Sequence, residues 1–95
     1  MAAYFIGRIQ VRDPVEYQKY TAQTPGLIQK YGGRFLVRGG PVKFTEGSWE
    51  PDRWVVLEFP DMASLEKWYH SKEYQEVLPI RKSSATSDAV AVEGV

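Results

Sequence analysis

The stretch "AYFIGRIQVRDPVEYQ" at residues 3–18 contains a complete transition from strand to helix. Side chains in its first part alternate between two faces, with Phe5, Gly7, Ile9 and Val11 on one and Tyr4, Ile6, Arg8 and Gln10 on the other. Alternation of this kind is typical of a half-buried strand. Asp13 and Pro14 then stand in the order of an N-cap and a first helical residue, and Glu16 lies where a capping-box acid belongs. We therefore predict a strand over residues 3–11 and a helix that begins at Pro14.

The predicted helix continues through a proline. Residues that recur at helical spacing, mostly every three or four positions, fall on one face of the predicted helix: Tyr17, Tyr20, Thr24, Leu27, Ile28 and Tyr31. A true break at Pro25 would be expected to reset this phase, so we interpret Pro25 as a kink or a short irregularity within one helical segment. Gly32 and Gly33 suit the end of that segment.

A hairpin with a long connection is predicted next. The segments "RFLVR" at 34–38 and "RWVVLEF" at 53–59 have the composition of strands. The connection is rich in glycine, and its "VKFTE" part at 42–46 is expected to extend the strand pairing. Its first glycines are explained by turn geometry. Trp49 in this connection either lies across its own hairpin, packs on a partner subunit or covers a pocket.

The last third of the chain is predicted to hold two more helices and a strand. Asp61 is expected to cap the first of these helices, with Trp68 at its flank. The inward stripe of that helix is expected to consist of Met62, Leu65 and Tyr69. Ser71 is expected to cap a short helix, and "RKSSATSDA" at 81–89 is interpreted as a loop into a final strand in "DAVAVEGV" at 88–95.

The resulting order is β-α-β-β-α-β over one domain, residues 1–95. It is the order of the ferredoxin-like fold, an α+β fold in which a four-stranded antiparallel sheet carries its helices on one face. Side chains expected to face the helices are Phe5, Ile9, Val55, Leu57 and Phe59. The other face would carry Ile6, Arg8, Gln10, Trp54, Val56, Glu58 and Glu93. A mixed face that includes Trp54 and Val56 favours sheet-to-sheet pairing in a homodimer, although such a face can also meet water.

Composition argues against several classes of function. Lys plus Arg and Asp plus Glu number 12 each, so the net charge is zero and the electrostatic attraction of a nucleic-acid binder is missing. No stretch approaches the roughly 18–20 apolar residues of a membrane span, so we expect a cytoplasmic protein without a membrane partner. Because the chain has no cysteine and one histidine, neither a metal site nor a cofactor is expected.

Three ordered motifs carry a resemblance to a known family: "GGRFLVRGG" at 32–40, "EGSWEPDRWVVLEFPD" at 46–61 and "WYHSKEYQEVLPIR" at 68–81, followed by "VAVEGV". Together they resemble DUF1330, a family of unknown function in the dimeric α/β-barrel superfamily. The resemblance covers nearly the whole chain and implies a ferredoxin-like protomer paired through its sheet. Superfamily relatives include cofactor-independent monooxygenases, haem-degrading enzymes and muconolactone isomerases, and an activity taken from any of them would rest on fold alone.

The third motif contains a candidate ligand site. Tyr74 and Arg81 stand at positions i and i+7, which share one face if the helix continues through Pro79. A guanidinium beside a phenol can hold a ligand carboxylate through its fixed fork of donors. The alternative is a structural arginine that pairs with Glu46 or Glu58, or that caps carbonyl groups near Pro79.

Tyrosine is concentrated on the predicted helices. Five of the six tyrosines lie there, namely Tyr17, Tyr20, Tyr31, Tyr69 and Tyr74. A buried phenol usually finds a hydrogen-bond partner, so this pattern favours a cavity with polar groups between helices and sheet. The alternative is that the hydroxyl groups reach the edge of the domain or bond to backbone carbonyls.

Two further residues are candidates near this pocket. Arg38, at the end of the second strand, is placed either at the pocket mouth or at the dimer interface. His70 is a candidate general base because its unperturbed pKa lies near neutrality. The competing interpretation of His70 is a solvated residue at a helix end. An acidic residue is common at this place in the family, so the resemblance argues against a family-wide catalytic role for His70.

We therefore predict a homodimer that binds a small anionic or aromatic metabolite near Arg38, Tyr69, His70, Tyr74 and Arg81. Such a protein could be a metal-free enzyme that acts by proton transfer or cofactor-independent oxygenation. The alternative is a non-enzymatic structural or interaction dimer, in which the arginines form ion pairs and the tyrosines fill space. The residues alone leave both hypotheses open.

Overall fold

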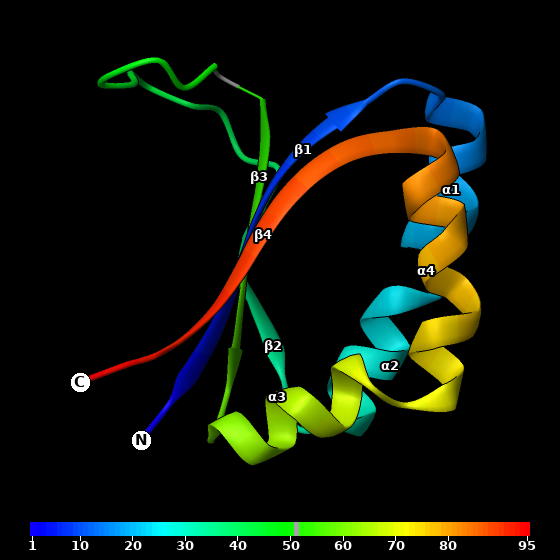
Figure 1. Cartoon of the computed structure of the whole chain (residues 1–95), viewed down its shortest axis with the longest axis vertical. Helices are drawn as coiled ribbons and strands as arrows, with labels where there is room; N and C mark the ends of the chain where they lie inside the picture. The colour runs from blue at the N-terminus through cyan, green and yellow to red at the C-terminus, as the bar shows by residue number, and fades with distance from the viewer. Residues whose placement is uncertain (51) are drawn as a thin grey trace.

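The computed structural model describes residues 1–50 and 52–95. Four antiparallel strands form one sheet in the order β2-β3-β1-β4. The strands are β1 (Ala3–Val11), β2 (Arg34–Arg38), β3 (Arg53–Phe59) and β4 (Ala85–Glu93). The helices are α1 (Pro14–Thr21), α2 (Thr24–Lys30), α3 (Met62–Tyr69) and α4 (Lys72–Ser84). All of them lie on one side of the sheet (Figure 1), so the predicted α+β ferredoxin-like arrangement is confirmed.

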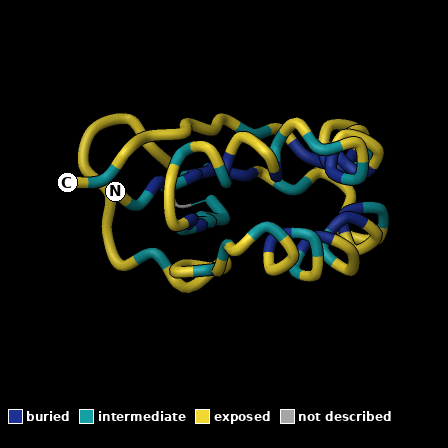
Figure 2. The backbone as a smooth tube through the Cα atoms, turned by 90° about the horizontal axis from the view of Figure 1, so that it is seen from below, coloured by how far each residue is buried: buried dark blue, intermediate teal, exposed yellow. Residues whose placement is uncertain are grey.

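The core lies between the sheet and the helices. Strand side chains that face the helices are buried, as their alternation predicts: Phe5, Ile9, Leu57 and Phe59. Figure 2 shows the buried residues gathered in the interior, whereas both chain ends are exposed. The two central strands, β1 and β3, therefore supply most of the sheet's contribution to the core.

The first helical region is two helices, which corrects the prediction of one helical segment with a kink or a short irregularity at Pro25. Ala22 and Gln23 separate α1 from α2. Pro25 lies in the first turn of α2, where its missing N–H group costs no helical hydrogen bond, so it starts a helix instead of bending one. The buried stripe still stays in phase across the break and comprises Tyr20, Thr24 and Ile28.

Trp68 lies at the centre of the core, not at its flank as predicted. Its side chain is 1% exposed. The ring centroid of Trp68 lies 5.4 Å from that of Phe59 on β3 and 4.3 Å from that of Tyr74 on α4. Met62 and Tyr69, which were expected to point inward, are only partly buried. The reason is that α4 follows α3 directly and encloses Trp68 from the side opposite the sheet.

The second helical region ends in a long helix, not in the predicted short one. α4 is a continuous helix of 13 residues with Pro79 inside it. As predicted, Ser71 caps the helix, because its Oγ accepts a hydrogen bond from the Tyr74 N–H at 3.1 Å. The continuous helix places Tyr74 and Arg81 on one buried face.

The predicted loop over residues 81–89 is absent, because β4 begins directly after α4. The carbonyl oxygen of Ser84 accepts hydrogen bonds from two backbone N–H groups at the end of β1. The Arg12 side chain also donates to the carbonyl oxygens of Lys82 and Ala85. These bonds satisfy carbonyl groups at the helix end, so the chain can turn directly into a strand.

Residues 39–50 and 52 form an arm on the side of the sheet opposite the helices (Figure 1). The "VKFTE" part does not pair as a strand, which corrects the prediction. Gly39 has a φ of 69°, which turns the chain out of β2, and Pro41 has no N–H group to donate. Trp49 packs on Trp54 with ring centroids 5.0 Å apart, so the interpretation that it lies across its own hairpin is confirmed.

β2 contains a β-bulge. Its pairing with β3 shifts between Phe35 and Val37, which leaves Leu36 as an extra residue. Beyond the bulge Arg38 pairs with Val55, which packs against the core. Without the extra residue, alternation from Phe35 would place Arg38 on the face away from the helices. The bulge therefore turns Arg38 toward the interior.

Ser71→Ala is expected to destabilise the protein, because Ser71 is the N-cap of α4 and its Oγ also donates to the Trp68 carbonyl at 2.8 Å. Loss of an N-cap costs about 1 kcal/mol. For a domain of this size, that lowers the melting temperature by roughly 4–8 °C. Calorimetry checks this result, with Ser83→Ala on an exposed position of the same helix as control. Equal effects of the two substitutions would contradict the capping role.

Candidate functional site

An inner cavity of about 40 Å³ lies between the sheet and the helices. This volume exceeds the roughly 10–15 Å³ that one water needs and is far below the roughly 300–1,000 Å³ of pockets for drug-sized ligands. Its walls are mainly apolar, but they include Arg38, Arg53 and Arg81. None of the described residues that line it is an aspartate or a glutamate. The cavity therefore combines positive charge with an apolar enclosure.

Arg81 and Tyr74 come together on the buried face of α4, as their spacing predicts. The hydroxyl oxygens of Tyr74 and of Tyr20 on α1 lie 2.6 Å apart, and Nη1 of Arg81 donates to the Tyr74 hydroxyl at 3.1 Å. The guanidinium carbon of Arg81 also lies 5.8 Å from the Tyr20 ring centroid. Only 7% of Arg81 is exposed. The three side chains form one buried polar cluster next to the cavity.

Arg81 is a buried cation among neutral phenols. Burial raises the pKa of Tyr74 and that of Tyr20, so both hydroxyls stay protonated at physiological pH. Burial is the largest single influence on the pKa of Arg81 and lowers it, but the neighbouring tyrosines, Tyr74 first, together shift that pKa upward. A guanidinium keeps its proton in proteins in any case. The ion pairs found among the described residues do not include Arg81, so its charge has no carboxylate partner in that part of the chain.

Unpaired hydrogen-bond donors converge on the same cavity. In the described part of the chain, three buried side-chain nitrogen atoms lack an acceptor: Arg53 Nε, Trp68 Nε1 and Arg81 Nε. All three belong to residues that line the inner cavity. Leaving a buried donor unpaired costs about 1–3 kcal/mol, so such groups are rare in folded proteins. Residues with unsatisfied buried donors are thus concentrated around the inner cavity.

Arg53 is the cavity residue that the sequence reasoning missed. It lies at the start of β3 on the same face as Leu57, and its guanidinium carbon lies 5.9 Å from the Tyr17 ring centroid. Gly39 leaves room for it, because a Cβ at that position would overlap Nη1 of Arg53. The signal was present in the alternation of "RWVVLEF", since Arg53 stands four residues before Leu57 and so shares its face.

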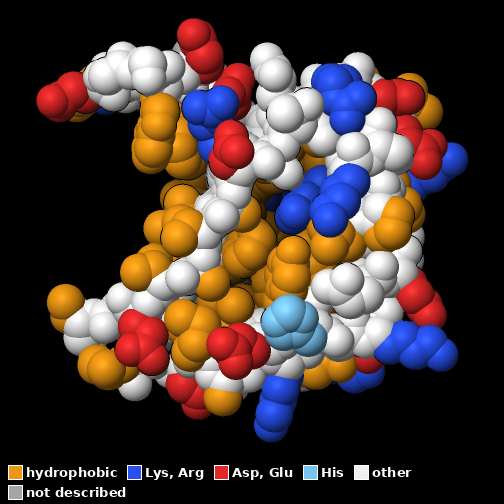
Figure 3. Space-filling view, viewed as in Figure 1, with side chains coloured by type: hydrophobic (Ala, Val, Ile, Leu, Met, Phe, Trp, Pro, Cys, Tyr) orange, Lys and Arg blue, Asp and Glu red, His pale blue; other side chains and the backbone are white. Residues whose placement is uncertain are grey.

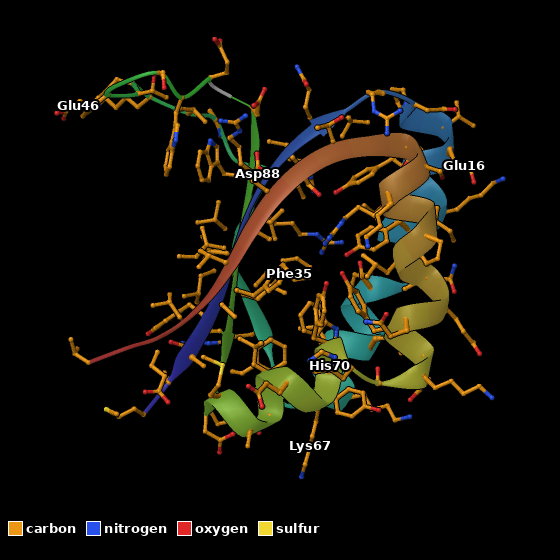
Figure 4. The ribbon with its side chains drawn as sticks, viewed as in Figure 1. Glu16, Phe35, Glu46, Lys67, His70 and Asp88 are labelled. Carbon is orange, nitrogen blue, oxygen red and sulfur yellow. The ribbon has the colours of Figure 1, made fainter. Side chains whose placement is uncertain are left out.

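Arg38 lies at the edge of the inner cavity and is exposed. Its guanidinium carbon lies 4.6 Å from the ring centroid of Phe35, a side chain that points between the sheet and the helices (Figure 4). This position corresponds to the predicted pocket mouth, and it exists because the bulge turns the end of β2 inward.

Tyr69 and His70 lie outside the inner cavity. They line a separate, open cleft between α3 and β4, which we call the outer cleft. His70 is exposed at the C-terminal end of α3, with its ring centroid 5.2 Å from that of Tyr69 (Figures 3 and 4). Phe5 and Ala89 line both hollows and so stand between them. Of the five residues predicted as one site, Arg38 and Arg81 line the inner cavity and Tyr69 and His70 line the outer cleft. Tyr74 lines neither hollow and contacts Arg81 beside the inner cavity.

The acidic partners suggested for Arg81 lie elsewhere. Glu58 pairs with Arg34, whose Nη2 lies 2.7 Å from Glu58 Oε1, and this contact lowers the pKa of Glu58. Glu46 lies at the outer end of the arm, on the far side of the sheet from α4 (Figure 4). The interpretation of Arg81 as the ion-pair partner of either carboxylate is therefore wrong.

Within residues 1–50 and 52–95, no group of three or more His, Cys, Asp or Glu side chains is placed to hold a metal ion. No helix in these ranges has both the length and the apolar character needed to cross a membrane. The charged side chains that line the inner cavity are arginines, which suit an anion and not a cation.

Several solved structures share this fold. A protein of unknown function from Rhodopseudomonas palustris is 15% identical, with a TM-score of 0.80, over 99% of this chain and 82% of that one. A dimeric ferredoxin-like protein of unknown function from Jannaschia sp. CCS1 is 17% identical, with a TM-score of 0.73, over 99% and 100% of the two chains. SnoaB, a cofactor-independent oxygenase from Streptomyces nogalater, is 14% identical, with a TM-score of 0.68, over 99% and 93%. Identities this low establish a common fold only.

Among curated proteins, none matches the sequence. The family model of DUF1330, a domain of unknown function, matches residues 2–95. This range includes all three motifs that carry the resemblance in the sequence. The chain therefore belongs to the DUF1330 family.

Proposed function

We propose that the protein binds a small carboxylate in the inner cavity and that Arg81 holds it. The observation that carries the proposal is a guanidinium that is 7% exposed, lines the cavity and has no carboxylate partner among the described residues. A buried charge without a partner is strongly unfavourable, so it is seldom kept without a function. A ligand carboxylate would neutralise the charge and accept from the unpaired Nε.

The surrounding residues fit this role. The Tyr20–Tyr74 hydroxyl pair fixes Arg81 through the Tyr74 oxygen, so little side-chain freedom remains to be lost on binding. Aromatic and aliphatic walls exclude water, which strengthens an ion pair made inside the cavity. The same walls accept the hydrocarbon part of the ligand, whether aliphatic or aromatic.

Binding is better supported than acid–base catalysis. No histidine or carboxylate is found among the described residues that line the inner cavity. The raised pKa values of Tyr20 and Tyr74 make both phenols poor bases near neutral pH. Proton transfer and cofactor-independent oxygenation stay predictions from the sequence, because the relation to the oxygenase SnoaB is one of fold.

The proposal is tested by titrating the protein with acetate, propionate and benzoate in a carboxylate-free buffer at pH 7. The corresponding amides are the controls, since they keep the shape and lose the charge. We expect the acids to bind by calorimetry and to raise the melting temperature, and the amides to do neither. Native mass spectrometry of freshly purified protein shows in parallel whether an acid is retained. Failure of every acid to bind, with no retained mass, would overturn the proposal.

Gly7→Ala is expected to block the cavity without harming the fold. Gly7 lines the cavity on β1, and a Cβ there would meet no atom closer than 3.9 Å. Replacing a strand glycine by alanine stabilises by about 0.5–1 kcal/mol, whereas the added methyl group takes up space that a ligand needs. We expect weaker acid binding together with an equal or higher melting temperature. Unchanged binding would show that the ligand lies elsewhere.

We also propose that two copies pair through the outer face of the sheet, the face away from the helices. Apolar side chains there are partly or largely exposed, namely Ile6, Val37, Val56, Val90 and Val92. Figure 3 shows hydrophobic side chains gathered in the hollow between the arm and the chain ends. Exposed apolar patches of this kind mark interaction surfaces. The similar fold from Jannaschia sp. CCS1 is described as dimeric, which supports the pairing.

Val90→Lys is expected to convert the dimer into a monomer. Val90 is 53% exposed in the protomer and pairs with Ile6 at the centre of the outer face, so a lysine there leaves the protomer intact but places a charge in the interface. Light scattering after size-exclusion chromatography measures the mass. Val15→Lys on α1, where the side chain is 74% exposed, is the control and is expected to stay dimeric. A dimeric Val90→Lys variant would place the interface elsewhere.

A further inference from the structure

We propose that the ligand of the inner cavity is a short dicarboxylate, with Arg53 holding the second carboxylate. This inference rests on the proposed function, in which Arg81 holds the first. It adds a second anion-binding group, contributed by the sheet and not by a helix, and thereby names the class of ligand.

The two arginines approach the cavity from opposite walls. Arg53 comes from β3 and Arg81 from α4, and both line the cavity. Each arginine lies beside one ring of a tyrosine pair, Tyr17 and Tyr20, whose ring centroids lie 5.7 Å apart. The guanidinium carbon of Arg53 lies 5.9 Å from the Tyr17 ring centroid, and that of Arg81 lies 5.8 Å from the Tyr20 ring centroid. The two guanidinium groups are thus held beside different rings of one tyrosine pair that lines the cavity.

In the described part of the chain, the half-buried Arg53 lacks an ion pair, as does the buried Arg81. The neighbouring carboxylate, Asp52, pairs with Arg8 on the outer face, where Arg8 Nε lies 3.2 Å from Asp52 Oδ2. No ion pair among the described residues includes Arg53. A monocarboxylate would neutralise one of the two guanidinium groups and leave the other. A dianion neutralises both, so it removes the repulsion between two like charges at one cavity.

The donors fit a molecule with two oxygen-bearing ends. Nε of Arg53 and Nε of Arg81 are both buried without an acceptor. The indole N–H of Trp68, which also lines the cavity, is a third such donor. A dicarboxylate offers four acceptor oxygens, whereas a monocarboxylate offers two. The Arg53 guanidinium lies against Gly39, and a Cβ at that position would overlap its Nη1.

The volume sets the length. The cavity is small, at about 40 Å³, so the chain between the two carboxylate groups must be short. Malonate and succinate are the probes of choice. Longer diacids would have to extend past Arg38 at the mouth and are expected to bind more weakly.

The test compares malonate and succinate with their monoamides, which keep the length and lose one charge. Affinities are measured by calorimetry at pH 7 for the wild type, Arg53→Met and Arg34→Met. Arg34→Met is the matched control, because it removes one positive charge from an exposed side chain outside the cavity. One charge-assisted contact is expected to make the diacids roughly 10- to 100-fold tighter than the monoamides for the wild type. Arg53→Met is expected to lose this preference, and Arg34→Met to keep it.

Equal affinities of diacid and monoamide for the wild type would overturn the inference while leaving carboxylate binding at Arg81 intact. An equal loss of the preference for diacids in Arg53→Met and Arg34→Met would also overturn the inference. The preference would then depend on the net charge of the protein and not on a contact with Arg53. Binding of no acid at all would overturn the proposed function as well. Gly39→Ala provides a second variant, because its Cβ displaces the Arg53 guanidinium without changing the net charge. It too is expected to lose the preference for diacids.

Discussion

Arg81→Met is expected to abolish carboxylate binding and to leave the protein at least as stable as the wild type. Removing one partner of a buried charge pair costs about 2–5 kcal/mol of binding free energy, which is roughly 30-fold or more in affinity. Without ligand, however, the guanidinium is a buried charge with no carboxylate partner, and methionine fills a similar volume without that penalty. Tyr74 keeps Tyr20 as its hydrogen-bond partner. Calorimetry and urea unfolding at pH 7 measure the two effects.

The same variant separates the two functional hypotheses. If Arg81 had a structural role only, its loss would lower the free energy of unfolding and no acid would bind the wild type. Arg12→Met is the matched control, because Arg12 donates to Thr86 and to two carbonyl oxygens at the junction of α4 and β4. We expect Arg12→Met to lower stability and to leave acid binding unchanged, the reverse of Arg81→Met. A clear loss of stability in Arg81→Met would favour the structural dimer.

Trp68→Ala is expected to be the most destabilising single substitution considered for this chain. The Trp68 ring contacts aromatic rings of Phe5, Phe59 and Tyr74, and its side chain is almost completely enclosed. Truncating a buried tryptophan costs about 3–5 kcal/mol, which is a large part of the roughly 5–15 kcal/mol that holds a small domain folded. Urea unfolding followed by circular dichroism measures the loss.

Trp49→Ala is the control for this prediction. Trp49 packs on Trp54 of its own hairpin and is 58% exposed. We expect a loss of about 1 kcal/mol or less at the same protein concentration. Similar losses in the two variants would contradict the central place of Trp68 in the core.

Periodicity predicted the fold because one face of each central strand is buried. A strand with one buried face must alternate, so the residue pattern alone assigns Phe5, Ile9, Leu57 and Phe59 to the inner face. Helix starts were equally readable, since Asp13, Asp61 and Ser71 each accept from a backbone N–H group in the first turn. Both signals are local, and local signals can be read from a sequence.

The predictions from the sequence were wrong where contacts between separate helices and strands determine the structure. Trp68 was placed at the flank because helical phase alone cannot show that α4 closes over it from the other side. Pro25 was interpreted as a kink because the stripe from Tyr20 to Ile28 keeps its phase across the break. The "VKFTE" segment has strand composition but forms no strand, because composition does not show whether a pairing partner is within reach.

The candidate site was predictable in part. Tyr74 and Arg81 could be paired because seven residues return to the same side of a helix, provided that the helix continues through Pro79. His70 could not be excluded from the pocket by spacing alone, because it follows Tyr69 directly. The alternation of β3 places Arg53 on the same face as Leu57, toward the cavity. It was missed because an arginine at the end of a strand is ordinarily solvated.

The bulge at Leu36 has a consequence for how this fold varies. One additional residue determines on which side of the sheet the charge of Arg38 lies. Deleting Leu36 would restore plain alternation and carry that charge from the cavity mouth to the face proposed for subunit pairing. A change in chain length by one residue would thus move a cation between two functional surfaces without any change of residue type. Insertions and deletions in this short strand are therefore as important to compare between relatives as substitutions at the arginine itself.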